Sequence, residues 1–482
     1  MVGKLILVSL LASGILLTLA FAPFNLGFLS YIAFIPLLYL AGKRSFLRGF
    51  IFGVGHYVTL LFWILFLVVP PPTKRWVVVG VIILIIYLAI YYGILSLAIK
   101  HLGMISMPFT LVVLEFIRSQ GDLGFPWGVV GYTQTPYLPI LQFASIFGIY
   151  GLSFIVGLFN LIFYLLIKRK IYQLLTLPIA IVLLGIVLIK PTRSTGLKVG
   201  ILQPNINTNI VWNESLRDRT FDQLLLQTQS LAQREARLII WPESSMPAII
   251  ASHREYRERL KALADSEQVS ILLGTGLVER KKRLKLYNGA ILIRPGEGVV
   301  AQYRKIHLVP FSEHLPYEQR LRFLKDIEFG QGDYWPGSEF TIFDVGKRFG
   351  CLICFESIFP ELSRRYVADG SDFLINITND GWFGKSPGPF QHAQMAIVRA
   401  VEERVPLVRS ANTGVSMVVD PYGRIIKESE IFKKTSLVVN IPERDSSLYH
   451  NLGDLIVYIS VAVLWFLIIR ALRPSLLPSD RR

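Results

Sequence analysis

Cysteine is scarce in this 482-residue chain, which contains only Cys351 and Cys354. Two cysteines three residues apart provide neither a disulfide framework nor a zinc site, so both classes of fold are excluded and no metal is expected. Charged residues are also few, at 17% of the chain. Hydrophobic residues make up 52% of the chain and its mean hydropathy is +0.48, which is unusually apolar for a soluble protein of this length.

The charge balance is strongly basic, with a formal net charge of +16. A nucleic-acid partner would require a basic helix or a basic patch interleaved with aromatic residues, and the sequence has neither. Many of the Lys and Arg residues flank apolar segments, which is the arrangement that sets the orientation of a membrane protein. We therefore expect a membrane protein with no nucleic-acid partner.

The apolar residues are concentrated in two parts of the chain, residues 1–190 and 454–472. Crossing the roughly 30 Å of hydrocarbon in a bilayer takes about 20 apolar residues. We expect the first segment to stay uncleaved, because Pro23 directly follows the small residues that would mark a cleavage site. The sequence predicts eight membrane helices, at about 3–20, 26–42, 47–69, 76–99, 104–119, 141–167, 171–190 and 454–472.

Basic residues predict how these helices are oriented. An even number of spans places both termini on one side. Of the Lys and Arg that flank the apolar segments, most lie at the segment ends on that side: Lys4, residues 43–48, Lys100, residues 168–170 and residues 470–482. The positive-inside rule then puts both termini in the cytoplasm. We predict an inner-membrane protein with a membrane domain at 1–190, a periplasmic domain at 191–453, and a last helix and cytoplasmic tail at 454–482.

Two charges fall within the fifth apolar segment. Glu115 and Arg118 are three residues apart and share a helix face. They form either a local ion pair or the lining of an entrance for a lipid headgroup. The following loop, residues 124–128, contains Trp127, an aromatic residue of the kind that favours headgroup depth.

Strands and helices alternate in residues 191–453 and strands dominate towards its end, which predicts an α/β layered sandwich. Strands are expected at 197–203, 238–241, 269–276, 287–293, 339–345, 349–355, 373–376, 406–411, 415–419 and 435–440. Helices are expected at 215–236, 253–267, 358–369 and 389–404. At roughly 250 residues, this region is large enough to bury its own core.

Three reactive side chains stand out, and α/β folds place their functional groups at strand ends. Glu243 follows Trp241-Pro242, Lys305 lies in the run Tyr-Arg-Lys-Ile-His-Leu-Val-Pro-Phe, and Cys354 precedes Phe-Glu. The three motifs together resemble the nitrilase, or carbon–nitrogen hydrolase, superfamily. With seven spans before this region and one after it, the chain resembles the bacterial apolipoprotein N-acyltransferase family, whose extramembrane domain is an αββα sandwich.

The resemblance implies a catalytic triad whose chemistry follows from the residue types. A thiol needs a base to become a nucleophile, a carboxylate can accept its proton, and an ammonium group can stabilise an oxyanion. Cys354 is the expected nucleophile, Glu243 the base and Lys305 the oxyanion stabiliser. Taken singly, these residues could be a core thiol, a helix cap and a surface ion pair. Cys351, three positions from Cys354 along a strand, is expected to pack in the core.

Other residues are assigned with the triad. The resemblance implies that Glu313 and Glu356 support activity; Glu356, two residues after Cys354, would share its face on a continuing strand, and either acid could orient Lys305 or form a structural ion pair. Trp127, Trp335 and Trp382 are candidate substrate-binding residues. His307, His314 and His392 are interpreted as structural.

The resemblance implies acyl transfer without a cofactor. The acyl donor would be a membrane phospholipid and the acceptor a diacylglyceryl apolipoprotein, with a thioester on Cys354 between the two steps and a monomeric enzyme. A membrane-tethered amidase or nitrilase acting on small amides is one alternative. An inactive lipoprotein-binding or transport protein is another, but such a protein has no need for all three triad residues.

Overall fold

The computed structural model of the protein describes residues 2–207, 216–246, 249–280, 284–317 and 333–472. The chain forms two compact units. The first unit comprises Met1–Phe62, Val78–Leu188 and Asn451–Arg482, and the second comprises Trp63–Val77 and Ile189–His450. The predicted tail beyond residue 472 and the first position of the helix expected at 215–236 lie outside the described residues.

The first unit is helical. Within the described residues, four helices are long and apolar enough to cross a membrane: Ser45–Phe66, Pro71–Leu102, Ala144–Arg169 and Leu455–Leu472. Shorter apolar helical segments occupy Gly3–Leu19, Gly27–Tyr39, Ser106–Ile117 and Tyr172–Val187. Helix is therefore present at every predicted apolar segment, while the count of eight spans stays a prediction.

The helices of this unit pack in sequence-distant pairs: α1 lies against α3, and α14 lies against α5 and α7. α7 contains a break at Gly148, whose φ is +65° and ψ is −170°. The bounds are α1 (Val2–Leu19), η1 (Gly27–Tyr31), α2 (Ile35–Tyr39), α3 (Ser45–Leu61), α4 (Pro71–Leu102), α5 (Ser106–Ile117), η3 (Val130–Gln134), α6 (Leu138–Leu141), α7 (Ala144–Arg169), η4 (Tyr172–Leu175), α8 (Thr176–Val187) and α14 (Leu455–Leu472).

Glu115 and Arg118 fix a loop of the first unit. Arg118 Nη1 donates to the carbonyls of Phe125, at 2.8 Å, and Trp127, at 2.9 Å. Glu115 Oε1 accepts from the Val130 amide at 2.7 Å and lies 3.9 Å from Arg118 Nη2. Both side chains are buried. These contacts fit the local ion pair, and the entrance for a lipid headgroup stays a prediction.

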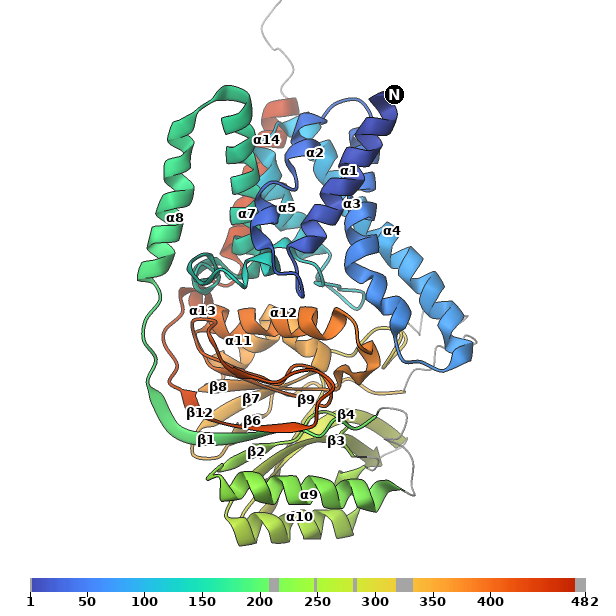
Figure 1. Ribbon diagram of the computed structural model, residues 1–482, viewed down its shortest axis with the longest axis vertical. Coiled ribbons are helices and arrows are strands. Elements are labelled where there is room, and N and C mark those ends of the chain that lie inside the picture. Colours follow the sequence, from blue (N-terminus) through green and yellow to red (C-terminus); the bar gives the residue numbers. More distant parts are fainter. Residues whose placement is uncertain (1, 208–215, 247–248, 281–283, 318–332, 473–482) are drawn as a thin grey trace, which may run out of the picture. The chain divides into compact units, whose positions relative to one another are not determined.

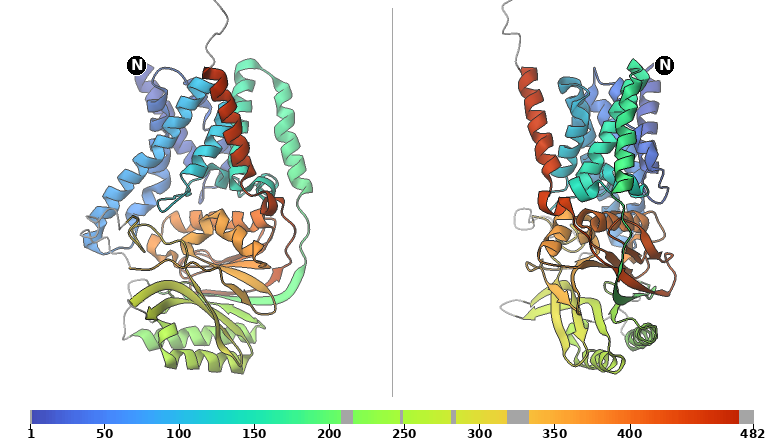
Figure 2. Two further views of the ribbon diagram at one scale, coloured as in Figure 1. Left: turned by 180° about the vertical axis from the view of Figure 1, so that it is seen from behind. Right: turned by 90° about the vertical axis from the view of Figure 1, so that its left-hand side faces the viewer.

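The second unit is a four-layer αββα sandwich, which confirms the predicted fold of this region. Figure 1 shows α9 and α10 covering the outer face of one sheet and α11 and α12 covering the outer face of the other, and Figure 2 shows the same layers from two further sides. The sheets have the strand orders β12-β1-β2-β3-β4-β5 and β11-β10-β9-β8-β7-β6. The Ser410 hydroxyl on β9 donates to the carbonyl of Leu202 on β1, which joins the inner faces.

The strands of this unit are β1 (Ser194–Gln203), β2 (Leu238–Ile240), β3 (Ser270–Arg280), β4 (Leu284–Arg294), β5 (Gly298–Arg304), β6 (Ile342–Asp344), β7 (Arg348–Ile353), β8 (Phe373–Thr378), β9 (Leu407–Ala411), β10 (Met417–Val419), β11 (Ile425–Glu428) and β12 (Thr435–Pro442). Its helices are η2 (Phe62–Phe66), α9 (Arg217–Gln233), η6 (Ile250–Ser252), α10 (Arg254–Glu267), η8 (Cys354–Ile358), α11 (Pro360–Ala368), η9 (Asp380–Phe383), α12 (Gly388–Glu403) and α13 (Leu448–Leu452).

Parallel pairing places several loops at one edge of each sheet. β1, β2 and β3 are parallel neighbours, as are β7, β8 and β9. The carboxyl ends of neighbouring parallel strands meet at the same edge, which is where ligands bind in α/β sheets. Glu243, Cys354 and Asn379 all follow such strand ends.

The segment Trp63–Val77 belongs to the second unit although it lies between α3 and α4 in sequence. The Trp63 indole N–H donates to Gln391 Oε1 at 3.1 Å, and its ring meets Phe383 edge-on at a centroid distance of 4.9 Å. The Val68 amide donates to the Trp382 carbonyl at 2.9 Å. The segment is therefore tied to η9 and α12.

Candidate active site

Glu243 occupies a tight position after β2. Both carboxylate oxygens are engaged: Asn288 Nδ2 donates to Oε1 at 2.7 Å, and the Asn379 amide donates to Oε2 at 2.9 Å. A Cβ at Gly274 of β3 would lie 2.7 Å from the Glu243 Cα, so only glycine allows this approach. The carboxylate is therefore held in one orientation.

Lys305 directly follows β5 and its side chain is fully enclosed. Its ammonium group lies 2.9 and 2.8 Å from the two oxygens of Glu313 and 3.9 Å from Glu243 Oε1. Asn288 Nδ2 donates to Glu313 Oε1 at 2.8 Å as well as to Glu243, so one amide bridges the two acids. The Lys305 backbone amide donates to the Asn288 carbonyl at 2.8 Å, which locks this arrangement to β4.

Cys354 lies at a sharp turn between β7 and η8. Its φ is +52°, a left-handed conformation that costs a non-glycine residue about 1–2 kcal/mol. Strain of this kind marks residues that the surrounding structure holds in place, often at functional sites. Cys351, within β7, is completely buried while Cys354 is partly exposed, as the spacing predicts.

Glu356 does not share a strand face with Cys354, which corrects the sequence interpretation. β7 ends at Ile353, and Glu356 lies in η8. Its Oε1 accepts from Tyr303 Oη at 2.8 Å and from the amides of Ile306 and His307 at 2.7 and 3.0 Å, and its Oε2 accepts from the Ile353 amide at 2.7 Å. Glu356 thus joins the backbone after Lys305 to the backbone before Cys354. Apart from the Tyr303 hydroxyl, its hydrogen-bond partners are backbone amides, whereas Glu313 pairs with the ammonium group directly.

The electrostatics of the cluster favour proton exchange. Burial raises the pKa of Glu243 against the opposing charge of Lys305. Burial, followed by the Glu243 charge, raises the pKa of the Cys354 thiol. Burial alone would lower the pKa of Lys305, but Glu313 and Glu243 outweigh it and the pKa lies above its usual range. A cationic Lys305 therefore stands beside a carboxylate with increased proton affinity and a neutral thiol.

These five residues lie in the second unit, and comparisons with known proteins show the family of the chain. The carbon-nitrogen hydrolase family matches residues 198–450, and the apolipoprotein N-acyltransferase N-terminal domain matches residues 13–162. An apolipoprotein N-acyltransferase of Geobacter metallireducens is 37% identical over 93% of this chain and 92% of its own length. The chain belongs to the apolipoprotein N-acyltransferase family.

Two further proteins are similar to this chain. An apolipoprotein N-acyltransferase of Haemophilus ducreyi is 31% identical over 91% of this chain and 92% of its own length. Among solved structures, an amidase from Nesterenkonia sp. matches with a TM-score of 0.39 and 19% identity, over 52% of this chain and 92% of that chain. The family assignment rests on the relatives that span the chain.

The three candidate tryptophans of this apolipoprotein N-acyltransferase family member differ in placement. Trp382, in η9, is 44% exposed, and Trp335 is 43% exposed with Lys285 Nζ 4.2 Å from its ring centroid. Trp127 is buried in the first unit, with its ring stacked near Phe125. Only Trp335 and Trp382 present an indole surface that a substrate could contact.

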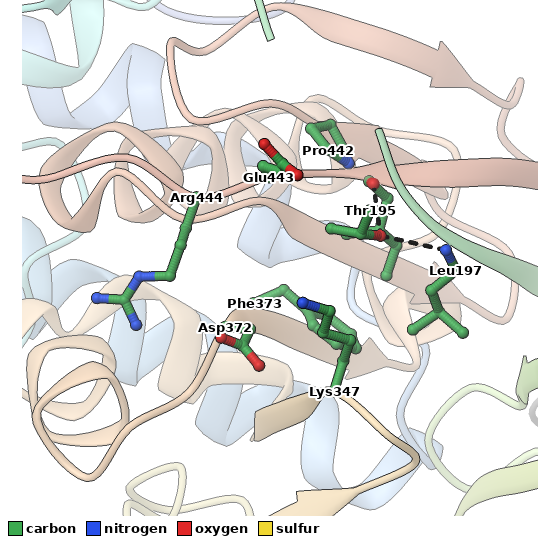
Figure 3. A pocket seen from close by; sticks show the side chains of 9 residues that line it. Thr195, Leu197, Lys347, Asp372, Phe373, Pro442, Glu443 and Arg444 are labelled. Carbon is green, nitrogen blue, oxygen red and sulfur yellow. Dashed lines mark hydrogen bonds between the residues drawn. The ribbon is translucent and has the colours of Figure 1, made fainter. Parts of the chain in front are cut away.

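One hollow of the second unit lies away from Cys354. It measures about 230 Å³ and contains Lys347, Asp372 and Arg444 among its lining side chains, which Figure 3 shows around an open centre. Lys347 precedes β7 and Asp372 precedes β8. Because Cys354 follows the other end of β7, the hollow belongs to the opposite edge of the sheet.

Several residues of the site were not identified in the sequence. Asn288, inside β4, carries no motif, yet it links Glu243 to Glu313. Thr378 ends β8, and its hydroxyl contacts the Cys354 thiol. Both are polar residues within otherwise apolar strands, and this pattern could have indicated that they belong to the site. His307 stacks on Phe359 at a centroid distance of 3.8 Å, in keeping with a structural role.

Proposed function

We propose that this chain transfers a fatty acyl group from a membrane phospholipid to the N-terminal amine of a diacylglyceryl-modified apolipoprotein. The observation that carries the proposal is that Glu243, Lys305 and Cys354 lie close together. The relatives that span both units of this chain are apolipoprotein N-acyltransferases. Glu243 is the proposed base, Cys354 the nucleophile and Lys305 the oxyanion stabiliser, with Glu313 and Glu356 in support.

In the first step, Glu243 accepts the thiol proton and the Cys354 sulfur attacks the ester carbonyl of the phospholipid. The tetrahedral oxyanion that forms develops its charge near the Lys305 ammonium, whose cationic state Glu313 maintains. The oxyanion collapses and the carbon–oxygen ester bond breaks. The departing lysophospholipid alkoxide takes the proton from Glu243, and the acyl group remains as a thioester.

In the second step, the α-amine of the apolipoprotein attacks the thioester carbonyl. Glu243 removes a proton from the attacking nitrogen, and collapse of the intermediate breaks the carbon–sulfur bond. The thiolate recovers that proton, leaving an amide on the lipoprotein and a free enzyme. Because donor and acceptor use one site in turn, the scheme is ping-pong.

The proposal includes a topology. Two lipid substrates favour a site beside a membrane, and four helices of the chain are long and apolar enough to span one. We propose an inner-membrane enzyme with eight spans, cytoplasmic termini, a periplasmic catalytic domain at 191–453 and a monomeric state. The boundaries 1–190 and 454–482 for the membrane parts belong to the same proposal.

Mass spectrometry of the purified full chain in detergent tests the function. After incubation with a phospholipid carrying a labelled acyl chain, we expect one acyl mass on the peptide that contains Cys354. Addition of a diacylglyceryl-cysteine peptide should remove that mass and yield an N-acylated peptide. Cys351→Ala, which leaves Cys354 in place, is the matched control and should still be acylated.

The same experiment separates the alternatives. An amidase or nitrilase would hydrolyse small soluble amides and would show no phospholipid-derived adduct on Cys354. An inactive binding protein would retain the labelled phospholipid without a covalent mass. Either result with the intact protein would overturn the proposed acyl transfer.

A further inference from the structure

A second polar cluster lies against the backbone of the proposed nucleophile. It consists of Thr378 at the end of β8, Asp380 in η9, His392 in α12 and Arg409 in β9, and is called the anchoring cluster below. All four side chains are completely buried. Burial of so many polar groups is costly unless their hydrogen bonds are made, so their pairing indicates what the cluster does.

The anchoring cluster meets Cys354 at its carbonyl oxygen. His392 Nε2 lies 3.1 Å from this oxygen. The Ser357 hydroxyl also donates to it at 3.0 Å, and Asn376 Nδ2 lies 3.4 Å away. A carbonyl surrounded by donors from three elements cannot rotate freely. Its orientation sets the peptide plane after Cys354 and helps to hold the φ of +52° at that residue.

The partners assign the His392 proton. A carbonyl oxygen only accepts, so Nε2 carries the proton in the contact with Cys354. Nδ1 then accepts from Arg409 Nη2 at 3.0 Å, and Arg409 Nη2 also donates to Asp380 Oδ2 at 2.8 Å. Asp380 Oδ1, which is 3.0 Å from Nδ1, accepts from the Thr378 hydroxyl at 2.9 Å. Burial and the Arg409 charge lower the pKa of His392, as a neutral ring requires.

The cluster is rigid on its far side too. A Cβ at Gly414 would lie 2.1 Å from Asp380 Oδ2, so the loop after β9 closes directly over the carboxylate. Arg409 Nη1 is bonded to Asn376 Oδ1, whose amide nitrogen reaches the Leu352 carbonyl at 3.0 Å. This path of hydrogen bonds therefore also reaches β7.

We propose that His392 is a positioning residue for Cys354, with Asp380 and Arg409 fixing the imidazole so that Nε2–H holds the Cys354 carbonyl. This hydrogen bond keeps the backbone in its left-handed turn and aims the thiol at the substrate carbonyl. The inference rests on the proposed function for the reaction it serves, while the geometry of the turn is independent of the substrate.

Two amide substitutions of His392 separate this role from general packing. The side-chain nitrogen of His392→Gln reaches the place of Nε2 and can still donate to the Cys354 carbonyl. The nitrogen of His392→Asn reaches only the place of Nδ1. Both replacements are neutral and hydrogen-bonding, so they differ mainly in which of the two contacts they can make. His253→Gln, at an exposed position before α10, is the matched control.

Three quantities are measured on the full chain in detergent: the rate of Cys354 acylation by labelled phospholipid, the rate of Cys354 alkylation by iodoacetamide, and the Tm. We expect His392→Gln to keep both rates within about threefold of the wild type. His392→Asn should lose about tenfold in both, the size expected for one hydrogen bond, with KM for the phospholipid unchanged. The control should behave as the wild type.

Equal losses in the Gln and Asn variants, whether of rate or of Tm, would overturn the positioning role. So would a loss confined to KM. If the wild type is alkylated at Cys354 but never acylated by phospholipid, the proposed function fails. The alkylation ratio between the two variants then decides the positioning inference separately.

Discussion

Two buried polar clusters flank Cys354, and they differ in their balance of acidic and basic side chains. The first joins Glu243, Lys305 and Glu313, where two carboxylates share one ammonium group. The anchoring cluster joins Asp380 to Arg409, one acid with one base, beside a neutral His392.

The pKa directions follow from this difference. Burial raises the pKa of Glu243. The pKa of Asp380 is lowered to about 2, because the Arg409 charge, helped by the hydrogen bond from Thr378, outweighs its burial. A cluster with an excess acid can take up and release a proton during a reaction, whereas a balanced cluster is fixed in one protonation state. In the proposed reaction, the first cluster exchanges a proton with the thiol and the anchoring cluster holds the Cys354 backbone in place.

Removal of the sulfur between the clusters should have the largest effect. We expect Cys354→Ala to reduce acyl transfer by about 10³-fold or more, because no other described thiol can form the thioester. Cys351→Ala should stay within a few-fold of the wild type, since Cys351 packs in β7. Both are measured as N-acylated peptide formed per unit time, and comparable losses in the two variants would contradict the assignment of the nucleophile.

Neutralisation of the first cluster should cost activity and raise stability. Glu243→Gln keeps the shape but cannot accept the thiol proton, so we expect acylation to fall by about 10² to 10³-fold. The folded-state pKa of Glu243 is above its ordinary value of 4.5, so the ionised form opposes folding at neutral pH and its removal should raise the Tm. Thermal unfolding at pH 7 checks this, and a fall in Tm would show that the charge is stabilising.

Neutralisation of the anchoring cluster should instead lower stability. Asp380→Asn removes one partner of a buried ion pair, and such losses cost about 3–5 kcal/mol of stability. Because folding depresses the Asp380 pKa from 3.8 to about 2, its contribution is complete above pH 4 and is lost as the pH falls through about 2. Denaturant unfolding between pH 2 and 5 should show a wild-type dependence that the variant lacks, and parallel curves would argue against the pairing.

The smallest effect is expected at the exposed indole of η9. Trp382→Ala should raise KM for the phospholipid a few-fold through lost apolar contact, which is worth about 0.5–1 kcal/mol at a partly exposed ring. The alkylation rate of Cys354 should not change, because both clusters remain. A change in alkylation instead of KM would place Trp382 among the residues that position the thiol.

The alternation of strands and helices predicted an α/β sandwich, and the family resemblance implied its αββα form and the triad. Glu243 and Cys354 each come after a buried apolar run that can only be a central strand. The strands β5 and β11 are not among the predicted strands. β11 is exposed along its whole length, so its sequence shows no alternation of buried apolar and exposed polar residues. Lys305 was found through its motif and not through the strand that precedes it.

The role of Glu356 could not be predicted from spacing. The argument required β7 to continue past Cys354, and the strand ends because Cys354 adopts a positive φ that nothing in its residue type announces. The interpretation of His392 as structural stays a prediction, and its contact with the Cys354 carbonyl could not be predicted because it depends on the meeting of α12 with η8. Contacts between elements distant in sequence leave no periodic signal.

The Trp63–Val77 segment has a consequence for how the protein is made. The segment is synthesised long before the helices on which it packs. Trp63 can therefore make its contacts with Gln391 and Phe383 only after the intervening chain has been synthesised and inserted into the membrane. Assembly of the second unit is therefore completed only after translation has passed α12. A fragment expressed from residue 191 onward would lack this segment and leave the η9 loop without its contacts to Trp63 and Val68.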